Sequence, residues 1–565
     1  MSSIRRHLTA RISAFSILTG LLISGVCPRG TAAEGRKSES AQGSAYVPLD
    51  SWVYPVLRRL AAMGYAPDEE SLTAPWTRRQ CLMLVEEAED IASRRSTKLS
   101  AGAMNNEVLQ LIAALKGEFS RESEAPASAS IESIYSRFAQ ISGPPLHDGY
   151  HFGQTITDDY GRPFGQGAST INGFSAYGAW GRFSGYFRGE YQQAPGHAGY
   201  SNQVRNFIAG ADQIPAPSAS GTPGVSRFDP LEMYVGAQLG DFNLTFGKQS
   251  IWWGPGEDSA FHFSNNAEPM YMFRAAQTMP ILLPGPFRFL GRIRTQFMLG
   301  RLSGHEFPPR PYINAQKITL QLTPDLEVGF TRSAIFGGVG HPLTVNSVLR
   351  SFFSTSSTGS TTFGSANDPG SRRSGFDFRW HIPKLRRYVT IYSDSLADDD
   401  PNPLANPRRA AWGPGIYLTQ LPHLQKMDFR FETYSTWLFR NDIAQNGIYW
   451  NNQYHDAYTN DGNVIGSWAG RDARAYIASS TYWHSAKDTL TASFRQIKTS
   501  SNFVPGGGTQ TDVSLNVQWE VRPEWMVTTF TQYERYFVPL LGNAQHGVSA
   551  GFQVTFYPAA WKLQR

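Results

Sequence analysis

One loop in the sequence carries the side chains best suited to binding a carbohydrate. Residues 248–256 read Lys-Gln-Ser-Ile-Trp-Trp-Gly-Pro-Gly. The adjacent indoles of Trp252 and Trp253 offer flat apolar surfaces on which the C–H face of a sugar ring can stack. The amide of Gln249 can both donate to and accept from sugar hydroxyls, and Lys248 can pair with an acidic sugar. These four side chains are therefore candidate polysaccharide-binding residues.

Each candidate also has a purely structural interpretation. Tryptophan concentrates at both interfaces of a membrane β-barrel, so Trp252 and Trp253 could belong to an aromatic girdle. The amide of Gln249 could bond a neighbouring strand inside a barrel, and Lys248 could pair with a carboxylate there. For these two polar residues the structural interpretation is favoured. The Gly-Pro-Gly that follows is expected only to shape a turn.

Catalytic chemistry has little support in the sequence. The 12 histidines are scattered, and no HExxH, GxSxG or paired-cysteine motif occurs. We therefore predict no catalytic residue, no metal site and no cofactor. A hydrolase with a serine–histidine pair at a barrel rim stays open, because such pairs assemble only in space.

The segment before the loop predicts a β-hairpin with one apolar and one polar face. Apolar residues alternate with polar or small ones on both sides of a Gly240-Asp241 turn. Period-two alternation through a two-residue turn is typical of a hairpin. The apolar positions are Leu231, Met233, Val235, Ala237 and Leu239 before the turn and Phe242, Leu244 and Phe246 after it.

The same alternation recurs through residues 121–565, in roughly 16 to 18 segments of the length a tilted membrane strand needs. We therefore predict an all-β transmembrane barrel of antiparallel strands, with apolar side chains facing lipid and polar ones facing the lumen. A soluble β-sandwich is the alternative. Short turns such as Gly181-Arg182 are expected on the periplasmic side, and long connections such as residues 194–228 and 442–471 on the outer side.

The lumen is expected to hold a set of charged side chains. We favour cross-strand ion pairs that stiffen the barrel over a path for translocation. The residues are Arg188, Glu190, Arg379, Asp428, Arg430 and Glu432.

The overall composition fits an outer-membrane barrel. The 565 residues are 41% hydrophobic, 17% charged and 13% aromatic, with a formal net charge of +5. Alternating segments keep the average hydropathy low although many residues face lipid. The small net charge and the absence of a lysine-rich run give no reason to expect a nucleic-acid partner.

Residues 1–33 predict a secretory signal peptide, with a basic start, an apolar core over residues 12–26 and Thr31-Ala32-Ala33 before the cleavage site. Cys27 is a poor lipoprotein anchor because bulky Val26 precedes it. Signal removal leaves Cys81, which we expect to be a buried core residue without a disulfide. Later residues contain no apolar stretch of about 20, so any membrane crossing must be made by strands. The predicted location is the bacterial outer membrane, reached through the periplasm.

Residues 34–120 predict a small periplasmic α-helical bundle. One apolar helical face begins at Trp52 and stops at Gly64, Thr77 and Gln80 form a capping-box pattern, and a third helix is expected over residues 108–119. Three short helices bury little surface alone. We expect them to dock on the periplasmic mouth of the barrel, where they would obstruct the lumen.

The motif Lys-Gln-x-x-Trp-Trp-Gly-Pro-Gly, followed by Asn265-Asn266-Ala267-Glu268-Pro269, resembles the Wzi-type capsule assembly proteins. The resemblance extends over most of the mature chain and implies an 18-stranded outer-membrane barrel with a periplasmic helical bundle. It also implies a non-catalytic, lectin-like role in attaching capsular or related exopolysaccharide, and adds Asn265 and Asn266 to the candidate residues. Many bacterial barrels end on an aromatic residue that the assembly machinery reads, whereas here Phe556 or Tyr557 lies a few residues before the final Arg565.

The expected partners are capsular or exopolysaccharide and outer-membrane lipid, and the expected state is a monomer. The alternative function is an outer-membrane pore for sugars or small solutes. A pore should conduct ions in steps across a planar bilayer, whereas a plugged binding barrel should conduct little.

Overall fold

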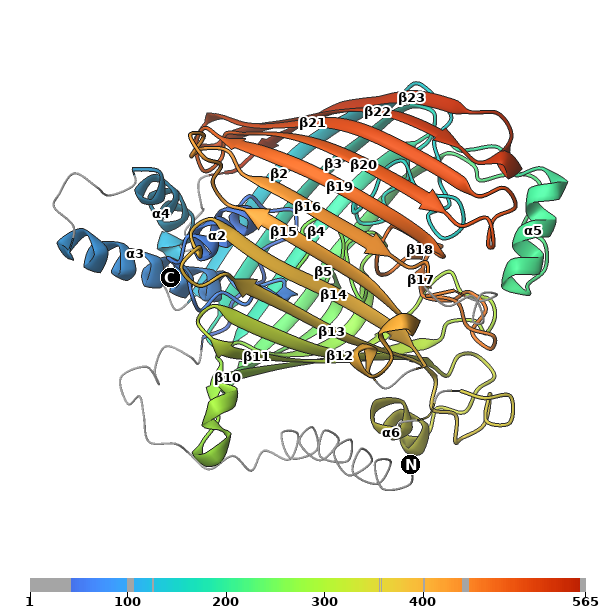
Figure 1. The fold of residues 1–565 in the computed structure, drawn as a ribbon, viewed down its shortest axis with the longest axis horizontal. Helices are drawn as coiled ribbons and strands as arrows, with labels where there is room; N and C mark the ends of the chain where they lie inside the picture. Colours follow the sequence, from blue (N-terminus) through green and yellow to red (C-terminus); the bar gives the residue numbers. More distant parts are fainter. Residues whose placement is uncertain are drawn as a thin grey trace.

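The structure is a computed structural model that describes residues 42–98, 106–123, 127–354, 356, 358–399, 402–438 and 447–558. In these ranges 18 long antiparallel strands form one closed barrel (Figure 1). Each strand pairs with its neighbour in the chain, and the first pairs with the last. Closure leaves no strand edge exposed to lipid. The predicted barrel is confirmed, whereas the predicted signal peptide, residues 1–33, lies outside the described residues.

The barrel strands are β2 (Ala127–Ile141), β3 (Gly167–Trp180), β4 (Phe183–Ala194), β5 (Val225–Leu239), β6 (Phe242–Gln249), β8 (Met270–Gln277), β10 (Arg292–Arg301), β11 (Tyr312–Thr323), β12 (Leu326–Phe336), β13 (Ser371–His381), β14 (Val389–Asp398), β15 (Ala410–Leu418), β16 (Phe429–Ser435), β19 (Ala473–Trp483), β20 (Thr489–Thr499), β21 (Gly508–Arg522), β22 (Trp525–Phe537) and β23 (Gln545–Phe556). A short strand, β9 (Ile281–Leu282), pairs with the start of β10.

Apolar side chains cover the outside of the barrel. On β5 the side chain of Val235 is 65% exposed, whereas its neighbour Tyr234 is buried. On β21 Trp519 is 61% exposed, and the inward-facing Asp512 is buried. The predicted orientation, with apolar residues toward lipid and polar residues toward the lumen, follows from this alternation.

One residue of the predicted outer face points the other way. Leu231 on β5 was expected to share the outer face with Met233 and Val235, but it is fully buried. The register between β4 and β5 shifts at Arg188 and Gly189, which leaves Leu231 without a partner across the ladder. A bulge of this kind inserts one residue and reverses the side-chain direction. The prediction for Leu231 was therefore wrong.

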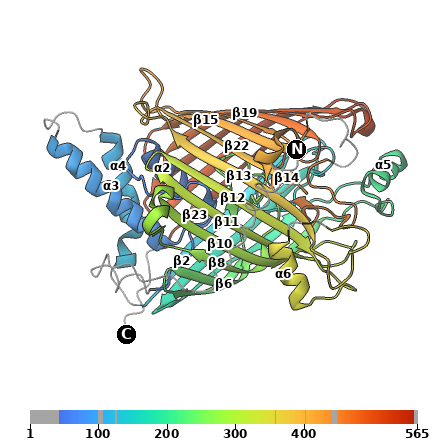
Figure 2. The same ribbon diagram turned by 60° about the horizontal axis from the view of Figure 1, so that its bottom comes forward.

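The two ends of the barrel differ, as the turn lengths predicted. Short turns and the helices α2 (Val53–Ala62), α3 (Arg78–Lys98) and α4 (Asn106–Phe119) lie at one end, and long loops with α5 (Asn202–Asp212) and α6 (Val345–Phe353) lie at the other (Figures 1 and 2). The remaining short elements are η2 (Ser120–Ser123), η3 (Gly285–Leu290), η4 (Pro403–Ala405), η5 (Pro407–Arg409) and η7 (Pro539–Leu541). No helix in the described ranges combines the length and the apolar character needed to cross a membrane.

Local signals explain where the N-terminal helices begin and end. The capping box before α3 is present: the Thr77 N–H donates to Gln80 Oε1 at 2.8 Å, and the Gln80 N–H donates to Thr77 Oγ1 at 3.1 Å. Gly64, just beyond α2, has a φ of +80°, a conformation that glycine adopts without strain. Cys81 is buried in the helical core, as predicted.

The helices are fastened to the barrel through a buried arginine. Arg59 on α2 is fully buried. Its guanidinium donates to Glu107 Oε1 on α4 at 2.8 Å, and to the carbonyl oxygens of Thr419 and Gln425 at 2.6 and 3.0 Å. The last two belong to the short turn between β15 and β16. One side chain thus joins two helices to the barrel rim.

Several separate parts of the chain fill the lumen. The connection between α2 and α3 contributes β1 (Thr73–Ala74), and the loop between β6 and β8 contributes β7 (Trp252–Trp253). These two short strands pair with each other rather than with the barrel wall. The loop between β16 and β19 adds β17 (Thr459–Asn460) and β18 (Asn463–Val464). The barrel therefore has an apolar core inside its lumen as well as an apolar surface outside.

Candidate functional site

The candidate loop, residues 250–269, turns from the end of β6 into the lumen. Its backbone is held on both sides. The Trp253 N–H donates to the Phe263 carbonyl oxygen at 2.9 Å, and the Gly254 N–H donates to the Leu72 carbonyl oxygen at 3.0 Å. In the β1–β7 pair Thr73 lies opposite Trp253 and Ala74 opposite Trp252. The loop is thereby joined to a segment about 180 residues earlier in the chain.

The two tryptophans lie in different cores. Trp253 is fully buried in the lumenal core, where its ring meets that of Phe263 edge to face with centroids 5.1 Å apart. Its Nε1 donates to Gln296 Oε1 at 3.3 Å. Trp252 is buried in the core shared with the helices, and its Nε1 donates to the Gly256 carbonyl oxygen at 3.2 Å. Adjacent residues of a strand point to opposite sides, so one dipeptide joins both cores.

The polar candidates on β6 have partners inside the barrel. Lys248 Nζ donates to Asp229 Oδ1 at 3.1 Å and also to Glu268 at the far end of the same loop. Gln249 Oε1 accepts from Thr245 Oγ1 at 2.7 Å, and its Nε2 donates to the Met272 carbonyl oxygen at 3.3 Å. Both side chains are buried. The favoured structural interpretation of Lys248 and Gln249 is thus the arrangement found.

The two asparagines join the candidate loop to other loops. Asn266 is fully buried; its Nδ2 donates to the Val464 carbonyl oxygen at 3.2 Å, and its Oδ1 accepts from the Asp158 N–H at 3.2 Å. The Asn265 carbonyl oxygen accepts from the Tyr160 N–H at 2.6 Å. All six predicted residues therefore lie within one buried assembly. Their predicted contact with polysaccharide stays a prediction.

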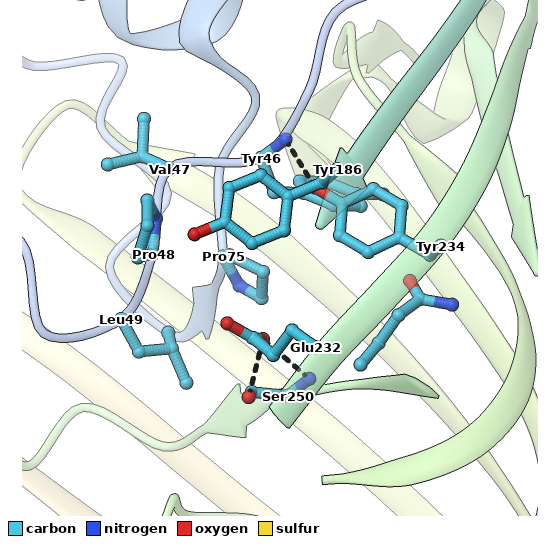
Figure 3. A pocket seen from close by; sticks show the side chains of 10 residues that line it. Tyr46, Val47, Pro48, Leu49, Pro75, Tyr186, Glu232, Tyr234 and Ser250 are labelled. Carbon is cyan, nitrogen blue, oxygen red and sulfur yellow. Dashed lines mark hydrogen bonds between the residues drawn. The ribbon is translucent and has the colours of Figure 1, made fainter. Parts of the chain in front are cut away.

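A small cavity lies beside this assembly (Figure 3). Glu232 Oε1 accepts from the Ser250 Oγ at 2.7 Å, and the Tyr46 N–H donates to the Tyr234 hydroxyl at 2.9 Å. The cavity measures about 10 Å³. That is room for about one water molecule and far too little for a sugar ring. This cavity can accommodate a solvent molecule beside the Glu232 carboxylate but not a glycan.

Ion pairs bind the inserted segments to the barrel wall. Arg188 on β4 donates to both carboxylate oxygens of Asp50 at 3.0 and 2.8 Å, and Glu190 accepts from Arg162 Nε in the β2–β3 loop at 2.9 Å. Arg379 on β13 donates to the Pro255 carbonyl oxygen in the candidate loop at 2.6 Å. The charged side chains in the lumen form ion pairs, as predicted. These pairs do not only link one strand to the next; they also link the barrel wall to the segments inside the lumen. No cluster of metal-ligating side chains occurs within the part of the chain that the structure describes.

At the long-loop end, α5 is held by a histidine between two carboxylates. His151 Nδ1 lies 2.8 Å from Asp148 Oδ2, and its Nε2 lies 2.9 Å from Asp212 Oδ2 at the end of α5. Arg471 also donates to Asp212, at 2.8 Å, and the Tyr150 ring lies against the imidazole. Burial by itself lowers the pKa of His151, but the two carboxylates outweigh it and raise the pKa to about 10.

Stability should therefore depend on pH through this histidine. Because the pKa is raised from 6.5 to about 10 on folding, the stabilisation is fully present below pH 6.5 and is lost as the pH rises through about 10. We expect the difference in thermal unfolding midpoint between the native protein and His151→Gln to be largest at pH 6 and to shrink toward pH 10. Calorimetry in detergent across this range measures it. A difference that stays constant or grows with pH contradicts this assignment.

Little in the sequence indicates the partners of the candidate loop. Asp229 lies outside the motifs quoted above, and Glu268 belongs to the Asn-Asn-Ala-Glu-Pro motif, but neither was predicted as the partner of Lys248. The two residues of β1 have no periodicity that could mark them as a strand. The one local signal that could have indicated a buried connection is Trp76, which is buried just after β1. The contacts are long-range and could not be read from spacing.

Comparisons with known proteins agree with this architecture. A family model described as capsule assembly protein Wzi matches residues 137–549. A protein of Klebsiella pneumoniae, described as an uncharacterized 55.8 kDa protein in the cps region, is 28% identical over 179 residues, which are 31% of this chain and 34% of that protein. The chain thus matches about a third of the length of that relative.

A solved structure is similar over nearly the whole chain. It is described as Wzi, an outer membrane protein involved in group 1 capsule assembly in Escherichia coli and a carbohydrate-binding β-barrel. The sequences are 16% identical, the match covers 92% of this chain and 100% of that one, and the TM-score is 0.65. At this identity the similarity establishes the fold.

Proposed function

Because this chain belongs to the family of Wzi capsule assembly proteins, we propose that it attaches capsular or related exopolysaccharide to the cell surface by binding it without chemical turnover. The family and the fold show that the chain is a capsule-related β-barrel of the outer membrane. We further propose that it acts as a monomer, with residues 34–120 in the periplasm and residues 121–565 as the barrel.

The observation that carries this proposal is the filled lumen. Residues 250–269, the segment around β1 and the loop between β16 and β19 meet inside the barrel. Their charges are paired with the wall by contacts such as Arg379 on β13 with Glu69 in the connection between α2 and α3. Moving a polymer through this lumen requires breaking buried ion pairs, and breaking one such pair costs about 3–5 kcal/mol. A filled barrel suits a polysaccharide that stays at the outer loops better than one that passes through.

Binding to polysaccharide tests the proposal directly. We expect the purified protein to be retained on immobilised capsular or exopolysaccharide from the bacterium that carries the gene, and not on unrelated dextran. We also expect cells lacking the protein to release that polysaccharide into the medium. Absence of retention, together with unchanged surface polysaccharide in the deletion strain, would overturn the proposed role.

A test of the six candidate residues must distinguish direct contact with the glycan from structural support of the loop. Lys248→Met removes the pairing with Asp229 and Glu268 at similar side-chain length. Because Asp229 and Glu268 lose this partner, the unfolding midpoint should fall in either case. If Lys248 contacts the glycan, retention measured well below the midpoint of the variant should fall as well; if Lys248 only holds the loop, retention at that temperature should stay near that of the native protein. The same comparison applies to Gln249, Trp252, Trp253, Asn265 and Asn266.

A pore for sugars or small solutes is the second candidate, and one observation favours it. A cavity of about 820 Å³ opens between α4 and the short-turn end of the barrel. It is lined by Glu118 and Tyr177, among others, by Lys487 in the β19–β20 turn and by Glu520 near the end of β21. Planar-bilayer recordings distinguish the candidates: a pore gives stepwise conductance, whereas the filled barrel should give little.

A further inference from the structure

The outward-facing side chains of β11, β12 and β13 change from apolar to polar at the same height on all three strands. Ile318, Phe330 and Phe376 are cross-strand neighbours on the outer face. Two residues nearer the long-loop end, the next outward tier consists of Gln316, Arg332 and Ser374. Polar groups facing hydrocarbon are costly, and an arginine costs about 2–4 kcal/mol at the bilayer midplane. Something must therefore cover this tier.

The apolar part of this wall is also short. On β12 the unbroken run of outward apolar residues, Leu326, Val328 and Phe330, spans roughly 13 Å along the strand at about 3.3 Å per residue. On β21 the outward residues from Val513 to Val521 span roughly 26 Å by the same measure. Because the strands of such barrels tilt by about 35–45°, the two runs are about 10 and 20 Å tall, against an apolar band about 25 Å tall. At β11–β13 the wall itself therefore supplies about half the height that it supplies at β21.

Helix α6 lies on the polar tier, outside the barrel (Figures 1 and 2). Asn314 Nδ2 donates to Ser351 Oγ at 2.6 Å, and Gln316 Nε2 donates to the Phe352 carbonyl oxygen at 2.9 Å. Arg332 donates to the carbonyl oxygens of Ser351 and Ser354. The last carbonyls of a helix have no partner within it and favour a cation. The polar side chains of the wall thus supply the hydrogen-bond donors that the last carbonyl groups of α6 lack, and the end of α6 supplies acceptors for those side chains.

The opposite side of α6 is apolar and uncovered. Val345 is 78% exposed and Leu349, one turn later, is 51% exposed; Leu343, just before the helix, is also exposed. The serines Ser347 and Ser351 are buried against the wall. A helix on the surface of a soluble protein has the opposite orientation, with its apolar face toward the protein core.

We propose that α6 and the residues leading into it lie in the outer leaflet of the membrane, with Leu343, Val345 and Leu349 in contact with lipid acyl chains. The apolar face continues the lipid-facing surface of β11–β13 at the level where the strands become polar. The helix thereby completes the apolar band on this side and shields Arg332 from hydrocarbon. The partner is lipid, not a second protein.

Site-directed spin labelling in vesicles tests the placement. The full protein carrying Cys81→Ala and Leu349→Cys is labelled and reconstituted in phosphatidylethanolamine–phosphatidylglycerol vesicles. Collision with oxygen, which concentrates in lipid, is compared with collision with a water-soluble nickel chelate. Val513→Cys on the outward face of β21 is the lipid reference, and Ser220→Cys in the exposed β4–β5 loop is the aqueous reference. Val345→Cys provides a second position on α6.

We expect the oxygen-to-nickel ratio at residues 345 and 349 to match that at residue 513. A ratio equal to that at residue 220 places the helix in water and overturns the proposal. Low collision with both reagents, or spin–spin broadening between labels, shows a protein covering the helix and overturns it as well. Heat-dependent gel mobility confirms that each variant is folded before the comparison.

Discussion

Replacing Trp253 with alanine should lower the free energy of unfolding by ~3–5 kcal/mol, the usual cost of removing a buried tryptophan. The indole is fully buried in the lumenal core, and it contacts Phe263 and Gln296. Its loss leaves a cavity where β7 meets β1, in the strand pairing that joins the N-terminal region to residues 250–269. The midpoint of thermal unfolding in detergent measures the change.

The matched control is Trp519→Ala. This tryptophan is of equal size but lies on the outer face of β21, 61% exposed. Detergent replaces the contacts it makes, so its removal should shift the midpoint by much less. Equal shifts for the two variants would show that the lumenal core contributes no special stability, contrary to the filled-lumen interpretation.

Replacing Arg59 with methionine should detach the helices from the barrel. The guanidinium is fully buried, and its removal leaves the Glu107 carboxylate buried without that partner. Breaking a buried ion pair from one side typically costs about 3–5 kcal/mol. The carbonyl oxygens of Thr419 and Gln425 lose a donor at the same time. We expect a lower unfolding midpoint and faster proteolysis of residues 42–123.

A second substitution tests whether the buried charge of Glu107 causes the loss of stability. Arg59→Met combined with Glu107→Gln removes the Glu107 charge and keeps an amide that Gln420 Nε2, now 3.3 Å from Glu107 Oε2, can still bond. The double variant should recover part of the lost stability. If it is as unstable as the single variant, the Glu107 charge is not the cause, and the contacts of Arg59 with the Asp428 carboxylate and with the two carbonyl oxygens carry the attachment.

The outer architecture of this protein could be predicted from local sequence patterns. Alternation such as that around Val235 and Trp519 requires one apolar and one polar face, and a long series of such strands can satisfy its backbone in lipid only by closing into a barrel. The capping residues Thr77 and Gln80 act on backbone groups three positions away, so the start of α3 was also predictable. These features depend on neighbours in the chain.

The filling of the lumen and the contacts of the candidate residues depend on long-range packing and became visible only in the folded protein. A two-residue strand such as β1 pairs through backbone groups that every residue possesses, so its pairing with Trp252 and Trp253 has no signature in sequence. The bulge that buries Leu231 and the helix that covers Arg332 likewise arise from contacts between distant segments. Periodicity reports which face a side chain is on, but not which distant segment will cover that face.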